Sequence, residues 1–376
     1  MTPPNLRVID RPAGGTQARS TLAIADGDVH VVPGDQKKEL FPFLAKRWQD
    51  HMATYGTRTR QGFANGPAYP KGQPDAARRD AYPPNGGKPG SNLEFMREQY
   101  FDALNVQLAV LNPLRSGQGQ QNLDYANALN HALNDWQIAE WTSKEPRCKG
   151  SVVVTYEDQD AAAKEIESRA GDPNFIQVLL LSRSAEPFGQ RRYNKVFEAA
   201  AANGFPVGIH AFGYGGAPVT GGGWPSYYLE EMIGHAQAQQ ALLVSLVMEG
   251  VFERLPDVKV VLIEAGFGWL PSLCWRMDKA WERMRDEVPH VKRPPSEYVK
   301  NQVWLTTQPM EEPEFKPHIL DIGKWIGWDR LLFATDYPHW DFDHPDNALP
   351  VKLDEETRTK FFLQNALDLY KPRPVA

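Results

Sequence analysis

The sequence predicts an α/β protein with the (β/α)8-barrel, or TIM-barrel, fold. Three observations lead to this prediction: eight short apolar runs have the composition of buried strands, helix-forming segments separate them, and polar side chains collect where the runs end. A chain of eight such units fits a barrel, in which the active site is built at the carboxyl ends of the strands.

The predicted strands are rich in β-branched and apolar residues without strict alternation, which is typical of strands buried on both faces of a parallel sheet. A doubly wound open sheet is the alternative. It requires a glycine-rich phosphate turn after the first strand, and ADGDVHVVPG does not supply one. The predicted strands are LAIADGDV (22–29), NVQLAVLN (105–112), GSVVVTY (150–156), FIQVLLLS (175–182), PVGIHAF (206–212), VKVVLIEAG (258–266), QVWLTTQ (302–308) and LLFATDY (331–337).

Segments with helical periodicity lie between these strands. Several end at the Gly or Pro expected just past a helix, as at Asn203-Gly204 before Phe205-Pro206. The clearest predicted helices are residues 91–104, 121–141, 159–170, 190–204 and 226–255.

We expect a polar N-terminal arm at residues 1–20 and a single barrel domain at residues 21–376. Residues 55–91 form an insertion too rich in Gly and Pro for a regular element, and residues 213–225 form a Gly-rich loop directly after the fifth strand. Both segments would lie on the catalytic face, so they are expected either to act as lids or to be tolerated surface insertions.

The composition argues against nucleic acid or a membrane as partner. The 376 residues are 23% charged with a net charge of −6, and no stretch approaches the roughly 18 consecutive apolar residues of a membrane span. The N-terminus lacks the apolar core of a secretory signal, and the two cysteines, Cys148 and Cys274, lie far apart in apolar surroundings. We therefore expect a cytoplasmic protein with reduced thiols, whose partners are a small-molecule substrate and further subunits, in a homo-oligomer or beside a homologous chain.

Polar residues at the strand ends predict a metal centre. Within DGDVH, Asp28 and His30 are two residues apart, so both can face the same side of a strand and reach one ion. Neutral nitrogen and anionic oxygen donors suit a divalent cation such as Zn, Mn or Fe, as one or two ions. A single buried His or Asp is more often hydrogen-bonded structure than a ligand, but here several converge on one rim. The strand-end residues are Asp28, His30, Asn112, Arg183, His210, Glu264, Asp336 and His339.

These motifs resemble those of the amidohydrolase superfamily, in the branch that contains metal-dependent hydrolases and non-oxidative decarboxylases. The resemblance covers roughly residues 21–370 and depends on DGDVH, GIH, IEAGFGWLP and FATDYPHWDFD. It implies that Asp28, His30, His210 and Asp336 hold the metal. The family usually has a histidine on strand 6, where this chain has Glu264, so this glutamate is expected to be a metal ligand, a base or a structural anchor.

Other residues near the rim have two possible roles each. His235 is expected to be either a half-buried helical histidine or a second-metal ligand, and His339 either a second-metal or substrate contact or a structural residue. Arg183 can clamp a substrate carboxylate with its planar guanidinium, and a salt bridge to Glu186 is its rival role. Trp224 and, from the end of the second strand, Asn112 complete the expected substrate-binding residues.

Three functions follow from this site. The leading hypothesis is a metal-dependent enzyme that hydrolyses or decarboxylates a small carboxylate-bearing substrate, with Asp336 or Glu264 moving a proton. The second is a non-haem dinuclear iron, or iron and manganese, oxygenase on the same barrel, because two histidines with several carboxylates also suit iron. The third is a non-catalytic subunit that binds metal for stability and partners an active homologue.

Overall fold

The computed structural model describes residues 22–56, 76–213 and 218–375. Its centre is an eight-stranded sheet in which neighbouring strands follow chain order and all printed pairings are parallel. Backbone hydrogen bonds from Gly27 to Phe333 (2.9 Å) and from His30 to Tyr337 (2.8 Å) join the last strand to the first, which confirms the predicted barrel. The strands are β1 Ile24–Val29, β2 Val106–Leu111, β3 Cys148–Val153, β4 Phe175–Leu181, β5 Val207–His210, β6 Val260–Ile263, β7 Val303–Thr306 and β8 Leu331–Leu332.

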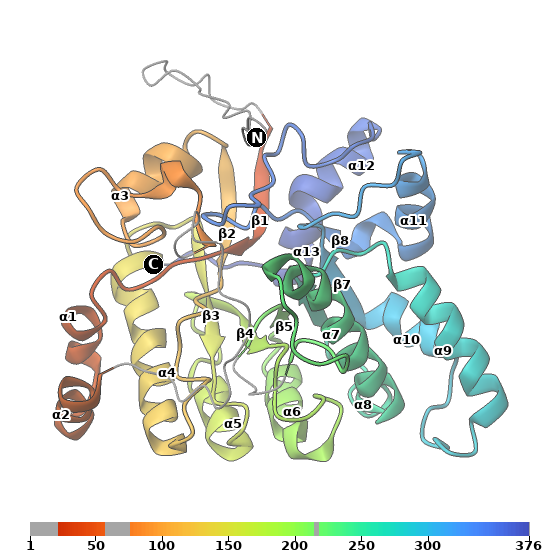
Figure 1. Ribbon diagram of the computed structural model, residues 1–376, viewed down its shortest axis with the longest axis horizontal. Coiled ribbons are helices and arrows are strands. Elements are labelled where there is room, and N and C mark those ends of the chain that lie inside the picture. Colours follow the sequence, from red (N-terminus) through yellow and green to blue (C-terminus); the bar gives the residue numbers. More distant parts are fainter. Residues whose placement is uncertain (1–21, 57–75, 214–217, 376) are drawn as a thin grey trace.

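Helices surround this sheet (Figure 1). Asn122 and Asp158 begin two of them by accepting hydrogen bonds from backbone amides of the first turn, as polar N-cap residues do. The helices are α1 Gln36–Leu40, α2 Lys46–Tyr55, α3 Leu93–Met96, α4 Leu123–Gln137, α5 Gln159–Ser168, α6 Asn194–Ala202, α7 Tyr228–Met248, α8 Val251–Arg254, α9 Leu270–Met284, α10 Pro295–Gln302, α11 His318–Ile326, α12 Glu355–Thr359 and α13 Asn365–Tyr370.

Two segments that were predicted to be continuous helices are interrupted in the structure. Residues 91–104 form only the short α3 followed by a π-helical turn at Arg97–Phe101. Residues 226–255 divide into α7 and α8, because Gly250 adopts the left-handed conformation (φ 73°) at the break. The spacing of apolar residues predicts neither a π-helical turn nor a left-handed glycine, so it could not reveal these interruptions.

The core has two parts. One fills the space between the barrel and its helices, and the other fills the inside of the barrel with residues such as Leu108, Val261 and Ile263. Helix α13 belongs to the inner part through Ala366, Leu369 and Tyr370, and it packs against β1 and β8.

The expected insertion at residues 55–91 is described only at its ends, because residues 57–75 lie outside the described residues. Ala77 pairs with His339, and the amide of Trp340 donates to the carbonyl of Ala76 (2.8 Å). The described part therefore lies beside the segment that follows β8, on the rim where the site was predicted. The N-terminal arm at residues 1–20 and residues 214–217 of the loop after β5 are likewise outside the described residues.

Cys148 and Cys274 are both free and buried, as expected for reduced thiols. Within the described residues, no helix is both long enough and apolar enough to cross a membrane.

A buried ion-pair network before β3 predicts acid sensitivity. The Glu145 carboxylate, 3% exposed, accepts hydrogen bonds from Arg97 (2.8 Å) and Arg147 (2.7 Å). Burial alone would raise its pKa, but the two guanidinium groups lower the pKa to about 2. Because the folded-state pKa lies below the unfolded value, stability from this network is present above about pH 4.5 and is lost as the pH falls to about 2.

We expect Glu145→Gln to lower the free energy of unfolding at pH 7 by about 3 kcal/mol. In urea titrations the difference from wild type should shrink between pH 5 and pH 2. Glu140→Gln, which breaks an exposed pair with Lys144, is the matched control and should change stability by less than about 1 kcal/mol. An unchanged difference across that pH range would contradict the role of Glu145.

Candidate metal centre

Two histidines at the ends of β1 and β5 point the same ring nitrogen into the mouth of the barrel. His30 contacts the carbonyl of Asn112 through Nδ1 (2.8 Å), and His210 contacts the carbonyl of Ala211 in the same way. A neutral imidazole has one N–H, so a donating Nδ1 leaves a lone pair on Nε2. In its neutral form, each histidine would therefore present Nε2 as a ligand.

Both Nε2 atoms face carboxylates. His30 Nε2 lies 2.8 Å from Asp336 Oδ1 and 3.3 Å from Asp28 Oδ1. His210 Nε2 lies 2.9 Å from Glu264 Oε2 and 3.3 Å from Asp28 Oδ2. A lone pair facing an anionic oxygen is repulsive, so each Nε2 must either carry a proton or share a bound cation with the carboxylates.

The charges and unpaired atoms of the site suit a bound divalent cation. Asp28 Oδ2 and His210 Nε2 are buried and have no hydrogen-bond partner among the described residues. Burial would lower the pKa of His210, but Asp28 and Glu264 raise the pKa to about 10. Asp28, His30, His210 and Glu264 each offer one ligand atom within 4.8 Å of the others. A divalent cation fits these residues, because it would meet the unpaired atoms and neutralise the carboxylates.

The backbone is unusual at three strand ends around the centre. Phe212 after β5, Glu264 after β6 and Asp336 after β8 all have positive φ angles, of 92°, 57° and 60°. Residues other than Gly adopt this conformation at a cost of order 1–3 kcal/mol, and such residues cluster at functional sites. Here the conformation turns Glu264 and Asp336 toward the two histidines.

The segment after β8 adds a second group of donors. His339 Nδ1 lies 2.7 Å from Asp336 Oδ1, and its ring stacks on His30 with centroids 4.3 Å apart. Asp341 places a carboxylate oxygen within 4.8 Å of oxygens of Glu264 and Asp336. Burial, followed by the charges of Asp336 and Glu264, raises the pKa of Asp341 to about 8. Sequence reasoning did not single out Asp341, although it lies within the motif FATDYPHWDFD.

Asn112 lies beneath the centre rather than facing a substrate. It is 0% exposed, and its side-chain amide donates to Asp28 Oδ1 (2.8 Å) and to the carbonyl of Gly27 (3.3 Å). Its backbone carbonyl accepts from His30 Nδ1, and its side-chain Oδ1 accepts from Ser151 Oγ (2.9 Å) and Gln177 Nε2 (2.8 Å). These contacts do not support the expected contact with a substrate, because both polar atoms of the side chain have partners inside the protein.

Arg183, His235 and Trp224 lie farther out. Arg183 forms a salt bridge with Glu231 of α7 (3.0 Å), not with the Glu186 that sequence suggested as its rival partner. His235 is 6% exposed, and burial lowers its pKa, so the ring is neutral at pH 7. Its Nδ1 has no hydrogen-bond partner among the described residues, but it is not among the groups whose ligand atoms come within 4.8 Å of one another. Trp224 is 40% exposed.

Asp26, which the sequence placed at the end of the first strand without a role, joins β1 to the segment after β8. Its Oδ1 accepts from the amides of Asp28 and Thr335 (both 3.0 Å), and its Oδ2 accepts from the hydroxyls of Tyr100 and Thr335 (both 2.5 Å). Burial raises the pKa of Asp26 to about 7. The side chain of Asp26 therefore links Thr335, the residue before Asp336, to the backbone of Asp28.

We expect Asp26→Ala to lower the free energy of unfolding by about 3 kcal/mol or more, because it leaves several buried donors without an acceptor. Asp26→Asn should cost less, since its amide oxygen can still accept from the two backbone amides. Urea denaturation of both variants measures the difference. Equal losses for Ala and Asn would contradict the bracing role of Asp26.

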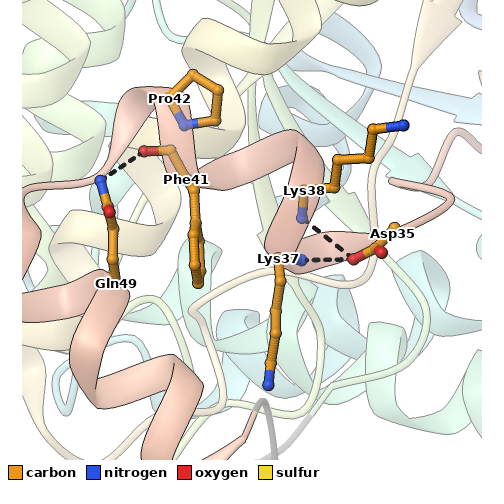
Figure 2. Close-up of a pocket in the computed structure, with 6 residues that line it drawn as sticks. All are labelled: Asp35, Lys37, Lys38, Phe41, Pro42 and Gln49. Carbon is orange, nitrogen blue, oxygen red and sulfur yellow. Dashed lines mark hydrogen bonds between the residues drawn. The ribbon is translucent and has the colours of Figure 1, made fainter.

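A surface hollow of about 530 Å³ lies elsewhere, at α1, α2 and the turn between them. Figure 2 shows Asp35 accepting hydrogen bonds from the backbone amides of Lys37 and Lys38, and Gln49 donating to the carbonyl of Phe41. None of the predicted site residues lines this hollow. The hollow is therefore separate from the metal centre.

Comparisons with known proteins agree with the fold and the centre. A gamma-resorcylate decarboxylase of Polaromonas sp. (strain JS666 / ATCC BAA-500) is 29% identical over 65% of this chain and 77% of the relative. A second gamma-resorcylate decarboxylase, of Rhizobium sp. (strain MTP-10005), is 25% identical over 74% of this chain and 88% of the relative. Neither relative supports the oxygenase alternative.

Solved structures share the barrel. An amidohydrolase from Mycobacterium avium subsp. paratuberculosis K-10 has a TM-score of 0.67 at 20% identity, covering 93% of this chain and 100% of the other. A dihydroxybenzoic acid decarboxylase from Polaromonas sp. JS666, with bound manganese and the inhibitor 2-nitroresorcinol, has a TM-score of 0.63 at 20% identity, covering 93% and 96%. The family model described as Amidohydrolase matches residues 25–371. The chain therefore belongs to the amidohydrolase family.

Proposed function

We propose that this protein is a metal-dependent decarboxylase of a small aromatic carboxylate. The observation that carries the proposal is the orientation of His30 and His210, whose Nε2 atoms both face carboxylate oxygens, at 2.8 Å and 2.9 Å. Asp28, His30, His210 and Glu264 bring their donor atoms within 4.8 Å of one another, and Asp336 Oδ1 lies 2.8 Å from His30 Nε2. Of these five residues, we assign Asp28, His30, His210 and Asp336 to a divalent metal and keep Glu264 for proton transfer. Manganese is the ion in a related solved decarboxylase, which favours it over zinc or iron as the first ion to test.

A divalent metal supplies Lewis acidity to the oxygens of a bound carboxylate. The protein supplies the ligand geometry, which is fixed before substrate arrives: Asn112 holds Asp28, and Gln308 donates to Asp336 Oδ2 (3.3 Å). Preorganised groups of this kind need no rearrangement during the reaction, which is how they lower its barrier.

Glu264 is the residue we assign to proton delivery. It is 8% exposed, whereas Asp336 is 0% exposed and is held by His30 and His339, so Glu264 has the better access to a substrate. In the reaction the acid protonates the ring carbon that carries the carboxylate. The bond from that carbon to the carboxylate then breaks, its electron pair returns to the ring, and carbon dioxide leaves. The conjugate base of Glu264 recovers a proton from solvent.

Residues around the mouth would receive the ring. Trp340, which follows β8, donates to the hydroxyl of Tyr228 at the start of α7 (3.2 Å). Trp224 lies in the loop after β5. Arg183 follows β4 and forms its salt bridge with Glu231 of α7. Aromatic side chains and a guanidinium on the same rim would suit an aromatic acid, because the first could contact the ring face and the second a carboxylate or phenolate oxygen.

The test is a substrate panel with protein reconstituted with Mn²⁺. We expect carbon dioxide release from gamma-resorcylate, 5-carboxyvanillate or a related hydroxylated aromatic acid, and its loss when a chelator removes the metal. Turnover of amides or esters without decarboxylation would replace the proposal by hydrolysis. No turnover of any acid, ester or amide by the metal-loaded protein would favour the non-catalytic subunit.

A further inference from the structure

A chain of hydrogen bonds runs from the C-terminal helix to a metal ligand through the inside of the barrel. The hydroxyl of Tyr370 in α13 donates to Gln177 Oε1 (3.1 Å), and Gln177 Nε2 donates to Asn112 Oδ1 (2.8 Å). Asn112 Nδ2 then donates to Asp28 Oδ1 (2.8 Å). Three side chains thus connect the end of the fold to the carboxylate that faces both histidines.

These hydrogen-bonded side chains lie inside the barrel, where apolar residues would be expected. Gln177 interrupts the run FIQVLLL of β4, and Asp28, Asn112 and Gln177 are 0% exposed, with Tyr370 at 6%. Space for it depends on β5, because a Cβ on Gly208 would lie 2.7 Å from Gln177 Oε1. Burying a side-chain amide costs free energy unless its N–H and C=O groups are hydrogen-bonded. The hydrogen bonds of these side chains therefore compensate for their burial.

Each member fixes the orientation of the next. The Tyr370 hydroxyl is a donor to Gln177 Oε1, so the amide nitrogen of Gln177 turns toward Asn112. Asn112 Oδ1 also accepts from Ser151 Oγ (2.9 Å), which leaves only its nitrogen to face Asp28. Without the Tyr370 hydroxyl, Gln177 Oε1 would be unpaired in an apolar interior, and only the two hydrogen bonds of Nε2, to Asn112 Oδ1 (2.8 Å) and Ser151 Oγ (2.9 Å), would hold the amide.

We propose that Tyr370 is a positioning residue for the metal centre, acting on Asp28 through Gln177 and Asn112. Helix α13 would therefore do more than close the end of the barrel, because its last residue sets the orientation of a ligand at the other end. The inference rests on the metal site of the proposed function. It concerns metal affinity and does not depend on which substrate is used. Partners behind the ligands of a metal commonly change its affinity by 10–100-fold when they are removed.

The test measures Mn²⁺ binding to chelator-stripped protein, by following the electron paramagnetic resonance signal of free Mn²⁺. We expect Tyr370→Phe to weaken binding by about tenfold and Asn112→Ala by about tenfold or more. Tyr125→Phe is the matched control, because it removes another buried tyrosine hydroxyl that has no hydrogen-bond partner among the described residues; it should bind Mn²⁺ as wild type does. Near-UV circular dichroism establishes that each variant is folded.

A double variant separates positioning from general destabilisation. If Tyr370 acts through Asn112, adding Tyr370→Phe to Asn112→Ala should weaken Mn²⁺ binding no further. Wild-type affinity in Tyr370→Phe, or a full additional loss in the double variant, would overturn the inference while leaving the proposed function in place. Absence of Mn²⁺ binding by the wild-type protein would contradict the metal site, and both proposals with it.

Discussion

Replacing Asp336 with asparagine is expected to lower decarboxylase turnover by about 10³-fold or more, since a metal ligand contributes several kcal/mol to the transition state. Asp336 Oδ1 contacts both His30 (2.8 Å) and His339 (2.7 Å), and Oδ2 accepts from Gln308. The amide of asparagine carries no negative charge, and it cannot serve all three contacts as an acceptor. Turnover of the preferred aromatic acid, with metal content measured on the same sample, checks the expectation.

Asp346→Asn is the control for Asp336→Asn. Asp346 is exposed and lies in the same segment after β8, so removing its charge should leave turnover within about twofold of wild type. If Asp336→Asn kept more than about a tenth of wild-type turnover, Asp336 could not be a ligand of the metal.

Glu264→Gln is expected to lower turnover by about 10²–10⁴-fold, the usual contribution of a general acid. Glutamine keeps the size of the side chain and removes only its ability to give up a proton. Because Asp28, His30, His210 and Asp336 remain, the variant should retain its metal. Single-turnover measurement of carbon dioxide release separates this chemical step from product release.

Glu264→His tests the same assignment from the other side, because the family usually has a histidine on strand 6. A histidine can also transfer a proton, so we expect Glu264→His to recover part of the turnover that Glu264→Gln loses. Loss of the metal from Glu264→Gln would instead make Glu264 a ligand, and wild-type turnover in that variant would remove it from the mechanism.

The sequence was sufficient for those parts of the site that local pattern determines. Asp28 and His30 are two residues apart at a strand end, and His210 and Asp336 end later strands, so topology alone brings them to one rim. The shift in pairing register between Asp26 and Val29 does not prevent Asp28 and His30 from converging, at 3.3 Å.

Other features depend on contacts between distant residues. The partners of Asp26 include Thr335, which is 309 residues away, and nothing near Asp26 in sequence indicates that pairing. Asn112 was expected to face a substrate, yet its side chain bonds to Asp28, Ser151 and Gln177, which lie 84, 39 and 65 residues away in the sequence. Asp341 is brought to the centre by the path of the loop after β8, which no periodic pattern describes.

The measurement that tests the central claim most directly is elemental analysis of the protein purified without added metal, beside the same analysis of His210→Ala. The account predicts at least one equivalent of manganese, zinc or iron per chain in the wild-type protein, and its loss in the variant. Absence of stoichiometric metal from both samples, even after reconstitution with Mn²⁺, would contradict the metal centre.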